Sequence, residues 1–311
     1  MGDRFRNAGD YTPSPGGNWA KLAFDPYRKH IEIPDDHVVT REQALAGLRQ
    51  SSKTSASISW IGHSTFLIRI GKRWLLTDPV FSGHVSPIPP FGPKRLVKPG
   101  LKLQDLPKLD AIILSHNHYD HMDFDSLVKL ANLNPNAKVL VPLANSSVLE
   151  RAGFTNIVEA DWFDTIRLAG MQFTAVPSVH SSRRGLADLN KSLWGGWSIR
   201  AGGRKIYFAG DTAKGSFIKE IRRRLGRHEL AIMPIGAYSP PEIEKGHHAT
   251  PEQSVQMARQ IGARHVVPMH WGTFALTKEP ISEQRRRFIR ATRGGPSPHV
   301  LRIGETIPLP R

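Results

Sequence analysis

Short apolar or alternating runs, separated by glycine and other turn residues, dominate the chain from residue 57 onward. Runs of this length between turn formers are typical of β-strands. The pattern predicts strands at residues 57–60, 65–70, 74–76, 110–115, 166–168, 172–176, 192–200, 205–209, 230–233 and 265–268. Apolar positions with helical spacing predict helices at residues 123–133, 213–225 and 251–261, and a shorter helix at residues 41–49.

The order of these elements predicts the fold class. Two similar halves, each made of strands flanked by helices, favour an α/β (α+β) four-layer αββα sandwich, in which two sheets pack between outer helices. We expect residues 56–311 to form this sandwich as a single domain, and residues 1–55, which contain four prolines, to form an N-terminal arm that wraps it. The arm has too few apolar residues, chiefly Trp19, Leu22 and Phe24, for an amphipathic membrane helix.

The segment directly after the predicted strand at residues 110–115 carries three histidines and an aspartate. It reads His116-Asn117-His118-Tyr119-Asp120-His121. Because histidine is scarce and the spacing lets alternate side chains converge from a tight turn, a metal centre is a stronger interpretation than a solvated polar turn. Imidazole nitrogens and carboxylate oxygens suit zinc and related divalent ions. The chain has no cysteine, which excludes a structural zinc finger with thiolate ligands.

Three further candidate ligands, His180, Asp211 and His270, each follow an apolar run that predicts a strand. Strand ends at one rim of a sandwich can converge although they are distant in sequence. A single histidine after a strand is more often a packed or surface residue, but the neighbouring histidine cluster favours all three as ligands.

The charge balance bears on partners more than on the fold. Lysine and arginine total 43 against 27 acidic residues, and the net charge of +16 predicts attraction to phospholipid headgroups, nucleic acid or phosphorylated small molecules. Basic clusters lie at residues 183–184, at 222–224 with 227, and at 285–287 with 290. Solvated helix faces account more simply for the last two. No run approaches the roughly 18 apolar residues of a membrane span, so we expect a soluble, cytoplasmic protein.

Longer motifs add a resemblance to a known family. The seven candidate ligands resemble, in their chain order, the strand-end ligands of the metallo-β-lactamase superfamily. Within it, the chain resembles the N-acylphosphatidylethanolamine-hydrolysing phospholipase D family over nearly its whole length. The matching segments are Arg4-Phe5 with Asn7, and residues 60–65, 77–82, 92–95, 115–121, 193–198, 208–212, 234–238 and 270–276.

This resemblance implies a metallo-β-lactamase fold with two divalent metal ions, zinc being the first choice. One metal would take His116, His118 and His180, the other would take Asp120, His121 and His270, and Asp211 would bridge them. Asp120 is also counted among the catalytic residues. Two such metals would lower the pKa of a water and position the hydroxide for attack on phosphorus.

Four further residues are candidates for supporting or catalytic roles. Asp78 would accept an N–H from a ligand histidine, although a plain Thr-Asp-Pro turn explains it equally well. His63, in a matched segment, is assigned with Asp78 to the residues behind the ligands. His248 precedes a predicted helix and would contact the substrate phosphate or assist the leaving oxygen, while Thr250 would cap that helix. Tyr238 would support the oxyanion, with a packed rim aromatic as the alternative.

The Pro-rich loop at residues 87–91 lies where the family shapes its substrate entrance. Phe81 and Phe91 are candidates to meet acyl chains, and Lys94 and Arg95 to meet headgroup phosphates. A packed proline loop is the simpler alternative.

The sequence therefore predicts a phospholipase D-type phosphodiesterase that releases an N-acylethanolamine and phosphatidic acid. Two alternatives stay open: a hydrolase of the same fold acting on RNA, nucleotides or a phosphorylated-sugar lactone, and a non-catalytic metal-binding regulator at a membrane. The expected partner is an anionic phospholipid or the inner face of a membrane, bound peripherally. A homodimer is a further possibility, and nucleic acid is a weaker one, because no aromatic and basic stacking stripe is visible.

Overall fold

The computed structural model describes residues 4–8 and 32–310. Residues 1–3, 9–31 and 311 lie outside this description. The prediction that the arm wraps the domain falls largely on these residues, and the prediction about Trp19, Leu22 and Phe24 falls on them entirely. The boundary between arm and domain at residue 55 stays a prediction. The first strand begins at Ala56.

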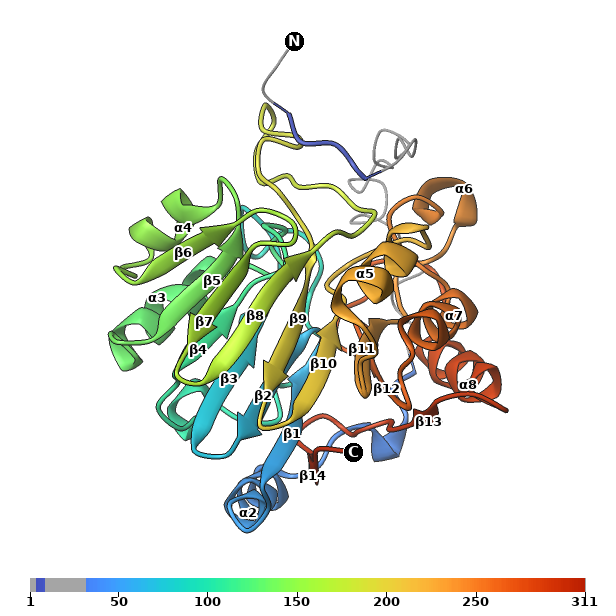
Figure 1. The fold of residues 1–311 in the computed structure, drawn as a ribbon, viewed down its shortest axis with the longest axis horizontal. Coiled ribbons are helices and arrows are strands. Elements are labelled where there is room, and N and C mark those ends of the chain that lie inside the picture. Colours follow the sequence, from blue (N-terminus) through green and yellow to red (C-terminus); the bar gives the residue numbers. More distant parts are fainter. Residues whose placement is uncertain (1–3, 9–31, 311) are drawn as a thin grey trace.

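Within the described residues, the strands form two seven-stranded sheets (Figure 1). In spatial order, the first contains β14 (Thr306–Pro308), β1 (Ala56–Gly62), β2 (Thr65–Ile70), β3 (Arg73–Thr77), β4 (Ala111–Ile113), β5 (Lys138–Pro142) and β6 (Ile157–Ala160). The second contains β13 (Ser297–Pro298), β12 (His265–Met269), β11 (Leu230–Pro234), β10 (Arg204–Phe208), β9 (Gly196–Ala201), β8 (Met171–Val176) and β7 (Thr165–Leu168).

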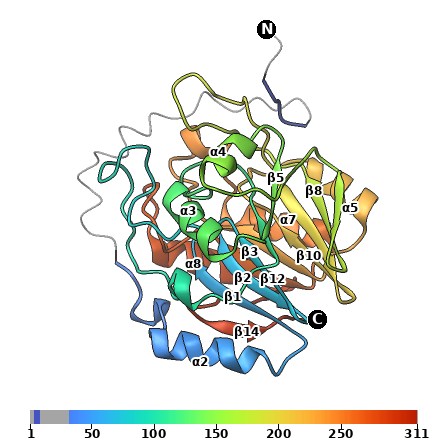
Figure 2. The same cartoon turned by 90° about the vertical axis from the view of Figure 1, so that its left-hand side faces the viewer.

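Helices cover the outer faces of the two sheets (Figure 1). The first sheet carries α3 (Phe124–Leu133) and α4 (Ser146–Arg151), and the second carries α5 (Phe217–Leu225), α7 (Pro251–Ile261) and α8 (Ile281–Ala291). The short α6 (Pro241–Glu244) precedes α7, and α2 (Arg41–Ser51) lies along β14 (Figure 2). This arrangement confirms the predicted four-layer αββα sandwich.

Alternation along the strands builds both interfaces of the first sheet. In β2, Phe66 and Ile68 join the core between the sheets, whereas Leu67 joins the cluster under α3 and α4. Successive side chains of a strand point to opposite faces, so a strand covered on both sides is apolar throughout. All six residues of β2 are accordingly buried.

Each predicted strand and helix has a counterpart in the structure, but some boundaries move. The strand predicted at 192–200 begins at Gly196, and the helix predicted at 213–225 begins at Phe217. The apolar pattern missed β5, β6, β13, β14 and the helices α4, α6 and α8. No described helix is long and apolar enough to cross a membrane.

Candidate metal centre

The candidate ligands meet at one edge of the sandwich because they follow the carboxyl ends of strands. The six-residue segment follows β4, His180 follows β8, Asp211 follows β10, and His270 follows β12. Strands β10, β11 and β12 are parallel neighbours, so their carboxyl ends share an edge of the second sheet. The ligand atoms form overlapping groups, each with its atoms within 4.8 Å of one another.

Three imidazoles form the first group. His116 Nε2 lies 2.9 Å from His118 Nδ1, and His180 Nε2 lies 3.2 Å from the same atom. The outer nitrogens have protein partners: His116 Nδ1 faces Ser115 Oγ at 2.9 Å, and His180 Nδ1 faces the carbonyl of His247 at 3.0 Å. These outer contacts orient the rings so that one nitrogen of each is free to hold a metal ion.

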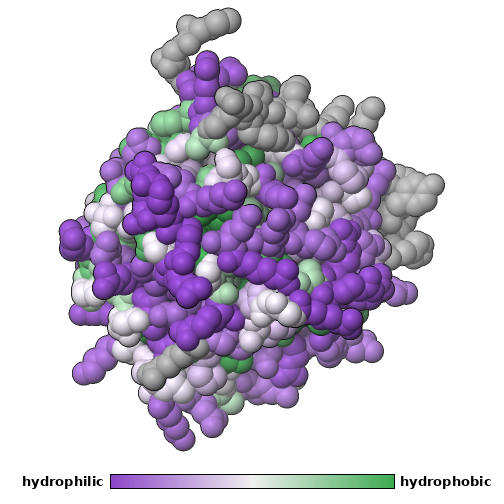
Figure 3. Space-filling model, turned by 45° about the vertical axis from the view of Figure 1, so that its right-hand side comes forward, coloured by the Kyte–Doolittle hydropathy of each residue, from purple (hydrophilic) through white to green (hydrophobic). Residues whose placement is uncertain are grey.

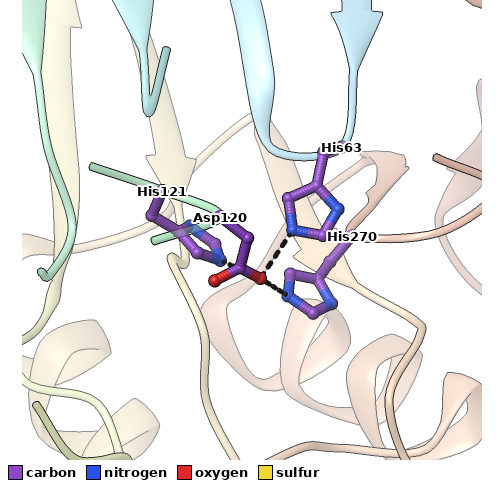
Figure 4. A group of neighbouring side chains, drawn as sticks. All are labelled: His63, Asp120, His121 and His270. Carbon is purple, nitrogen blue, oxygen red and sulfur yellow. Dashed lines mark hydrogen bonds and ion pairs between the residues drawn. The ribbon is translucent and has the colours of Figure 1, made fainter. Parts of the chain in front are cut away.

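Asp120 organises the second group (Figure 4). Its Oδ2 atom lies 3.0 Å from His63 Nε2, 3.3 Å from His270 Nε2 and 3.5 Å from His121 Nε2. The four side chains come from the β1–β2 turn, the segment after β4 and the end of β12, and they point toward one another. Two carboxylate oxygens and converging imidazoles are an ordinary donor set for a divalent ion.

Asp211 lies between the two groups. Its Oδ2 atom is 3.0 Å from His270 Nε2 and 3.1 Å from His121 Nε2, and 3.8 Å from His180 Nε2. A bridging ligand must reach both groups, and Asp211 alone among the seven candidates is a carboxylate within 4.0 Å of imidazoles from each. The structure thus brings all seven together, and their roles as ligands remain a prediction.

Buried atoms with incomplete hydrogen bonding support the fit to metal ions. Within the described structure, Asp211 Oδ1 forms no hydrogen bond, and His121 Nε2 and His270 Nε2 form none of good geometry, although they lie 3.1 and 3.0 Å from Asp211 Oδ2. Buried polar groups normally have a partner, and each one left without a partner costs free energy. All three atoms lie in the cluster and are of the types that bind zinc and related ions. The residues present therefore fit a pair of divalent ions.

Electrostatics keep the first group neutral. Burial lowers the pKa of His116 and His180 well below the usual value, and it lowers the pKa of His118 to about 4. A neutral imidazole offers its lone pair to a metal, whereas a protonated one does not.

The second group concentrates negative charge. Burial opposes ionisation of Asp211, but His121 and His270 outweigh it and hold the pKa of Asp211 well below its usual range. Burial likewise opposes protonation of His270, yet Asp211 and Asp120 raise the pKa of His270 to about 9. The two carboxylates thus draw positive charge to this spot. A divalent ion there would supply the charge that protons otherwise provide.

Asp78 stands behind the ligands. Its carboxylate accepts the Ser115 N–H at 2.7 Å and the Ser115 hydroxyl at 2.6 Å, and it faces His121 Nδ1 at 2.7 Å. The Ser115 hydroxyl donates its only proton to Asp78, so Ser115 Oγ accepts a hydrogen bond from His116 Nδ1. The neutral His116 ring therefore carries its proton on Nδ1, and its Nε2 is unprotonated. One buried carboxylate thereby fixes the orientation of ligand candidates from both groups.

Sequence reasoning missed Asn7 as a supporting residue. Its side-chain amide donates to the His180 carbonyl at 3.0 Å and accepts the His180 N–H at 2.9 Å. Asn7 Oδ1 also accepts a hydrogen bond from Trp194 Nε1 at 3.0 Å. Asn7 is 173 positions from His180, and its only signal was membership of a matched segment.

Of the two further catalytic candidates, His248 lies beside the cluster and Tyr238 does not. His248 lies beside the cluster, with Nδ1 3.9 Å from Asp211 Oδ2, and burial lowers the pKa of His248 to about 3. Tyr238 does not join it, because its hydroxyl donates to Glu283 at 3.1 Å and its ring packs under Arg287. The structure therefore favours the packed aromatic over the proposed oxyanion role for Tyr238.

The four candidates for substrate binding differ in their exposure to solvent and in their protein partners. Phe91 is 64% exposed and Lys94 is exposed, so both are available at the rim. Arg95 instead donates to the carbonyls of Ser82 and Val80, at 2.9 and 2.7 Å, which ties the loop down. Phe81 packs into the core cluster under α3. Arg95 and Phe81 therefore support the loop, and their roles as substrate contacts stay predictions.

Residues 73–271 match the β-lactamase superfamily domain. A solved structure of a metallo hydrolase, Igni18 from Ignicoccus hospitalis, superposes with a TM-score of 0.63 over 82% of this chain and 99% of that one. At 22% identity this likeness supports the fold alone. A metal-dependent hydrolase of Rubrobacter xylanophilus is 30% identical over 80% of this chain and 95% of its own length. Fold and cluster define a metal-dependent hydrolase.

Two further relatives carry a more particular name. The N-acyl-phosphatidylethanolamine-hydrolyzing phospholipase D 1 of Caenorhabditis elegans is 36% identical over 76% of this chain and 70% of that protein. The mitochondrial enzyme of that name in Saccharomyces cerevisiae is 33% identical over 77% of this chain and 52% of that protein. The chain belongs to the family that these relatives represent within the β-lactamase superfamily.

Proposed function

We propose that the protein is a phospholipase D-type phosphodiesterase that uses two zinc ions to hydrolyse an N-acylphosphatidylethanolamine-like phospholipid. The reaction adds water across a P–O bond, and it yields phosphatidic acid and an N-acylethanolamine. The observation that carries the proposal is the double His/Asp group with Asp211 between its halves. The names of the worm and yeast relatives support the choice of substrate.

Metal ions held by these residues would activate a water and stabilise negative charge on the phosphate oxygens. The chain's own contribution is to set the donor atoms in advance. Asp78 and the carbonyl of His247 fix the rings of His121 and His180 from behind. Such preorganisation removes the cost of rearranging ligands when the substrate binds.

His248 is the candidate to contact the phosphate. Its Nδ1 atom is buried and forms no hydrogen bond within the described structure, and its ring lies 5.1 Å from that of His270. Since burial lowers the pKa of His248 to about 3, the ring is neutral and one of its nitrogens carries a proton. That N–H would donate to a phosphate oxygen or to the leaving oxygen.

The rim beside the cluster supports a lipid as substrate. Val80, Val85 and Phe274 form a small apolar cluster, and the Phe274 ring packs edge-on against His63 with ring centres 5.2 Å apart. The loop continues outward to Ile88 and Phe91, which are 66% and 64% exposed. An exposed apolar loop that begins one ring away from the cluster is suited to acyl chains.

A membrane surface is the partner that we propose with this substrate. The net charge of +16 would attract anionic lipid, while Ile88 and Phe91 would enter its apolar layer. Hydrophilic residues cover most of the face that carries α7 and α8, so this face is a poorer candidate for insertion (Figure 3).

The proposal is tested with the metal-loaded protein and N-acylphosphatidylethanolamine in mixed micelles. Mass spectrometry should find N-acylethanolamine and phosphatidic acid in equal amounts, and the metal-chelated protein should release neither. A metal-loaded protein that leaves the lipid intact but cleaves RNA, a cyclic nucleotide or a phosphorylated lactone would refute the lipid proposal in favour of another hydrolase activity.

A further inference from the structure

A groove lies at the opposite end of the strands from the metal centre. It has a volume of about 650 Å³ and is lined by residues 227–229, 259, 262–264 and 294–296. Its walls are tied together by backbone hydrogen bonds from Arg264 N to Glu229 O at 3.0 Å, and from Ser297 N to Arg264 O at 2.8 Å. The groove is therefore built from three segments that are distant in sequence.

The position of the groove follows from the strand directions. Residues 227–229 precede β11, and residues 262–264 precede β12, so both lie at the amino ends of these parallel strands. His270 follows the carboxyl end of β12. Five strand residues separate the two ends, which corresponds to roughly 16 Å at about 3.3 Å per residue. A ligand in the groove would not touch the metal centre.

Arg227, Arg259 and Arg264 line this groove, and Arg222 lies beside it near Gly262. Arg222 Cζ and Arg227 Nε each lie 3.4 Å from the position that a Cβ on Gly262 would occupy, so both side chains cover the same point at the end of α7. Arg259 donates to the carbonyls of Ala291 and Arg293, at 2.9 and 3.0 Å, and lies against the 294–296 loop. Arg264 is exposed on the groove wall.

These arginines have no carboxylate partner. Within the described residues, Arg222, Arg227, Arg259 and Arg264 form no ion pair, in contrast to Arg223 and Arg224 on the neighbouring turn, which both pair with Glu220. One carboxylate, Glu229, lines the groove, and its Oε2 already accepts the backbone N–H of Lys205 at 2.8 Å.

Two observations on neighbouring groups agree with a positive field. Burial is the main cause that lowers the pKa of Lys205; Arg200 and Arg222 lower it further, and Glu229 partly opposes them. Burial also lowers the pKa of His228 to about 3, with Lys205 and Arg222 as additional causes. Glu229 offsets one of the four arginine charges, and the carboxyl ends of α5, α7 and α8 offset about half a charge each, so an excess of roughly one to two positive charges remains.

We propose that this groove binds a small anion with two or more phosphate groups. Guanidinium groups pair with phosphate oxygens through parallel N–H donors, and several of them together favour a multivalent phosphate over a single carboxylate. The volume of about 650 Å³ falls within the range of small-molecule sites. The bound anion relieves the repulsion among like charges that the fold brings together. The inference does not depend on the lipid substrate.

The test titrates inorganic diphosphate into the metal-loaded protein by calorimetry, with metal content measured before and after. The variant Arg227→Gln/Arg264→Gln removes two groove charges. Its matched control, Arg49→Gln/Arg167→Gln, removes two exposed arginines on α2 and β7, and so changes the net charge equally. We expect diphosphate affinity to fall at least tenfold in the groove variant and less than twofold in the control.

Three results would overturn the site. If the groove variant bound diphosphate as tightly as the wild type, the binding would belong to the metal centre. If both variants lost diphosphate affinity equally, the effect would be one of net charge. If the wild type bound no diphosphate, the groove would not be a site. Inorganic phosphate is titrated in parallel. Equal affinity for phosphate and diphosphate would contradict the multivalent ligand. Circular dichroism and retained hydrolase activity establish that both variants are folded.

Discussion

Asp78 shows how a single buried carboxylate sets the chemistry of a site. It contacts Ser115 and His121 at once, and through Ser115 it also reaches His116. Its backbone φ of 31° is unusual for a residue other than glycine, and His63 and His270 share this feature with φ of 52° and 61°. Left-handed backbone at three residues around the cluster is typical of positions where function outweighs local conformational preference.

The variant Asp78→Asn tests this role. Asparagine keeps the acceptor for Ser115 but presents an N–H₂ group to His121 Nδ1, which disturbs the tautomer that frees His121 Nε2. We expect metal affinity to fall by about 10- to 100-fold. Metal dissociation constants measured with a chelator competition assay report this directly. An equal metal affinity in both proteins, with only a lower melting temperature, would reduce Asp78 to a structural residue.

His228 is the clearest source of pH dependence outside the metal centre. It faces Ser198 Oγ at 2.8 Å, and burial lowers its pKa to about 3. In the unfolded chain its pKa is about 6.5, so the unfolded state binds more protons between these values. Stability is therefore complete above pH 6.5 and falls as the pH drops toward 3, by at most about 1.4 kcal/mol per unit from this residue.

Urea unfolding of the wild type and of His228→Gln at pH 7 and pH 5 measures this contribution. Glutamine cannot take up a proton, so the variant should lose less stability between the two pH values than the wild type does. The histidines of the metal centre contribute equally to both proteins and cancel in the comparison. Identical losses would mean that His228 is not the titrating group.

The segment that enters α7 connects a helix cap to the site. Thr250 and Gln253 form a capping box, with hydrogen bonds of 3.0 and 3.3 Å between side chain and backbone. The same segment supplies the His247 carbonyl to His180 and carries His248. The cap thus fixes the point from which both contacts are made.

Removing this cap should destabilise the protein without removing any metal ligand. Thr250→Ala is expected to lower the free energy of unfolding by about 1 kcal/mol, because the Gln253 N–H in the first turn of the helix loses its acceptor, the Thr250 hydroxyl. Thr250→Ser retains the hydroxyl and should stay close to the wild type. Denaturant titration of the three proteins decides the matter, and equal midpoints would show that the cap is not stabilising.

The limits of sequence reasoning are clearest at the element boundaries. The apolar run at residues 192–200 reads as one strand, but Gly195 donates its N–H to Ser115 and Trp194 donates to Asn7, so β9 begins only at Gly196. Likewise, Ala213 pairs with Val179 before α5 begins. These residues form hydrogen bonds with distant parts of the chain instead of continuing the strand or helix. A local pattern of apolar residues does not predict such partners.

The site was more predictable than its surroundings, for a physical reason. His116, His118 and Asp120 lie so close in sequence that only a local turn is needed to bring them together. The sequence did not predict the directions of Tyr238 and Arg95, because these depend on Glu283 and on the carbonyls of Val80 and Ser82. Residue type predicts what chemistry is available, whereas packing decides where each side chain points.

At the scale of the whole molecule, the apolar rim and the basic surface should act together at a membrane. Ile88→Ser/Phe91→Ser should raise KM for micellar phospholipid at least tenfold and leave hydrolysis of a soluble phosphodiester within twofold. Ile289→Ser, which alters a 43% exposed residue on α8, is the control. Equal loss on both substrates would place the effect in the catalytic site and refute a separate lipid contact. Dimer formation and location in the cell stay predictions.

The central claim is that the two His/Asp groups hold two catalytic metal ions. The most direct test measures metal per chain by mass spectrometry, together with phosphodiester hydrolysis, in purified, chelated and zinc-reloaded protein and in His118→Ala. We predict two ions per chain, activity lost on chelation and restored by zinc, and a folded His118→Ala with fewer ions and no activity. Activity that survives chelation, or a protein that takes up no metal, would contradict the account.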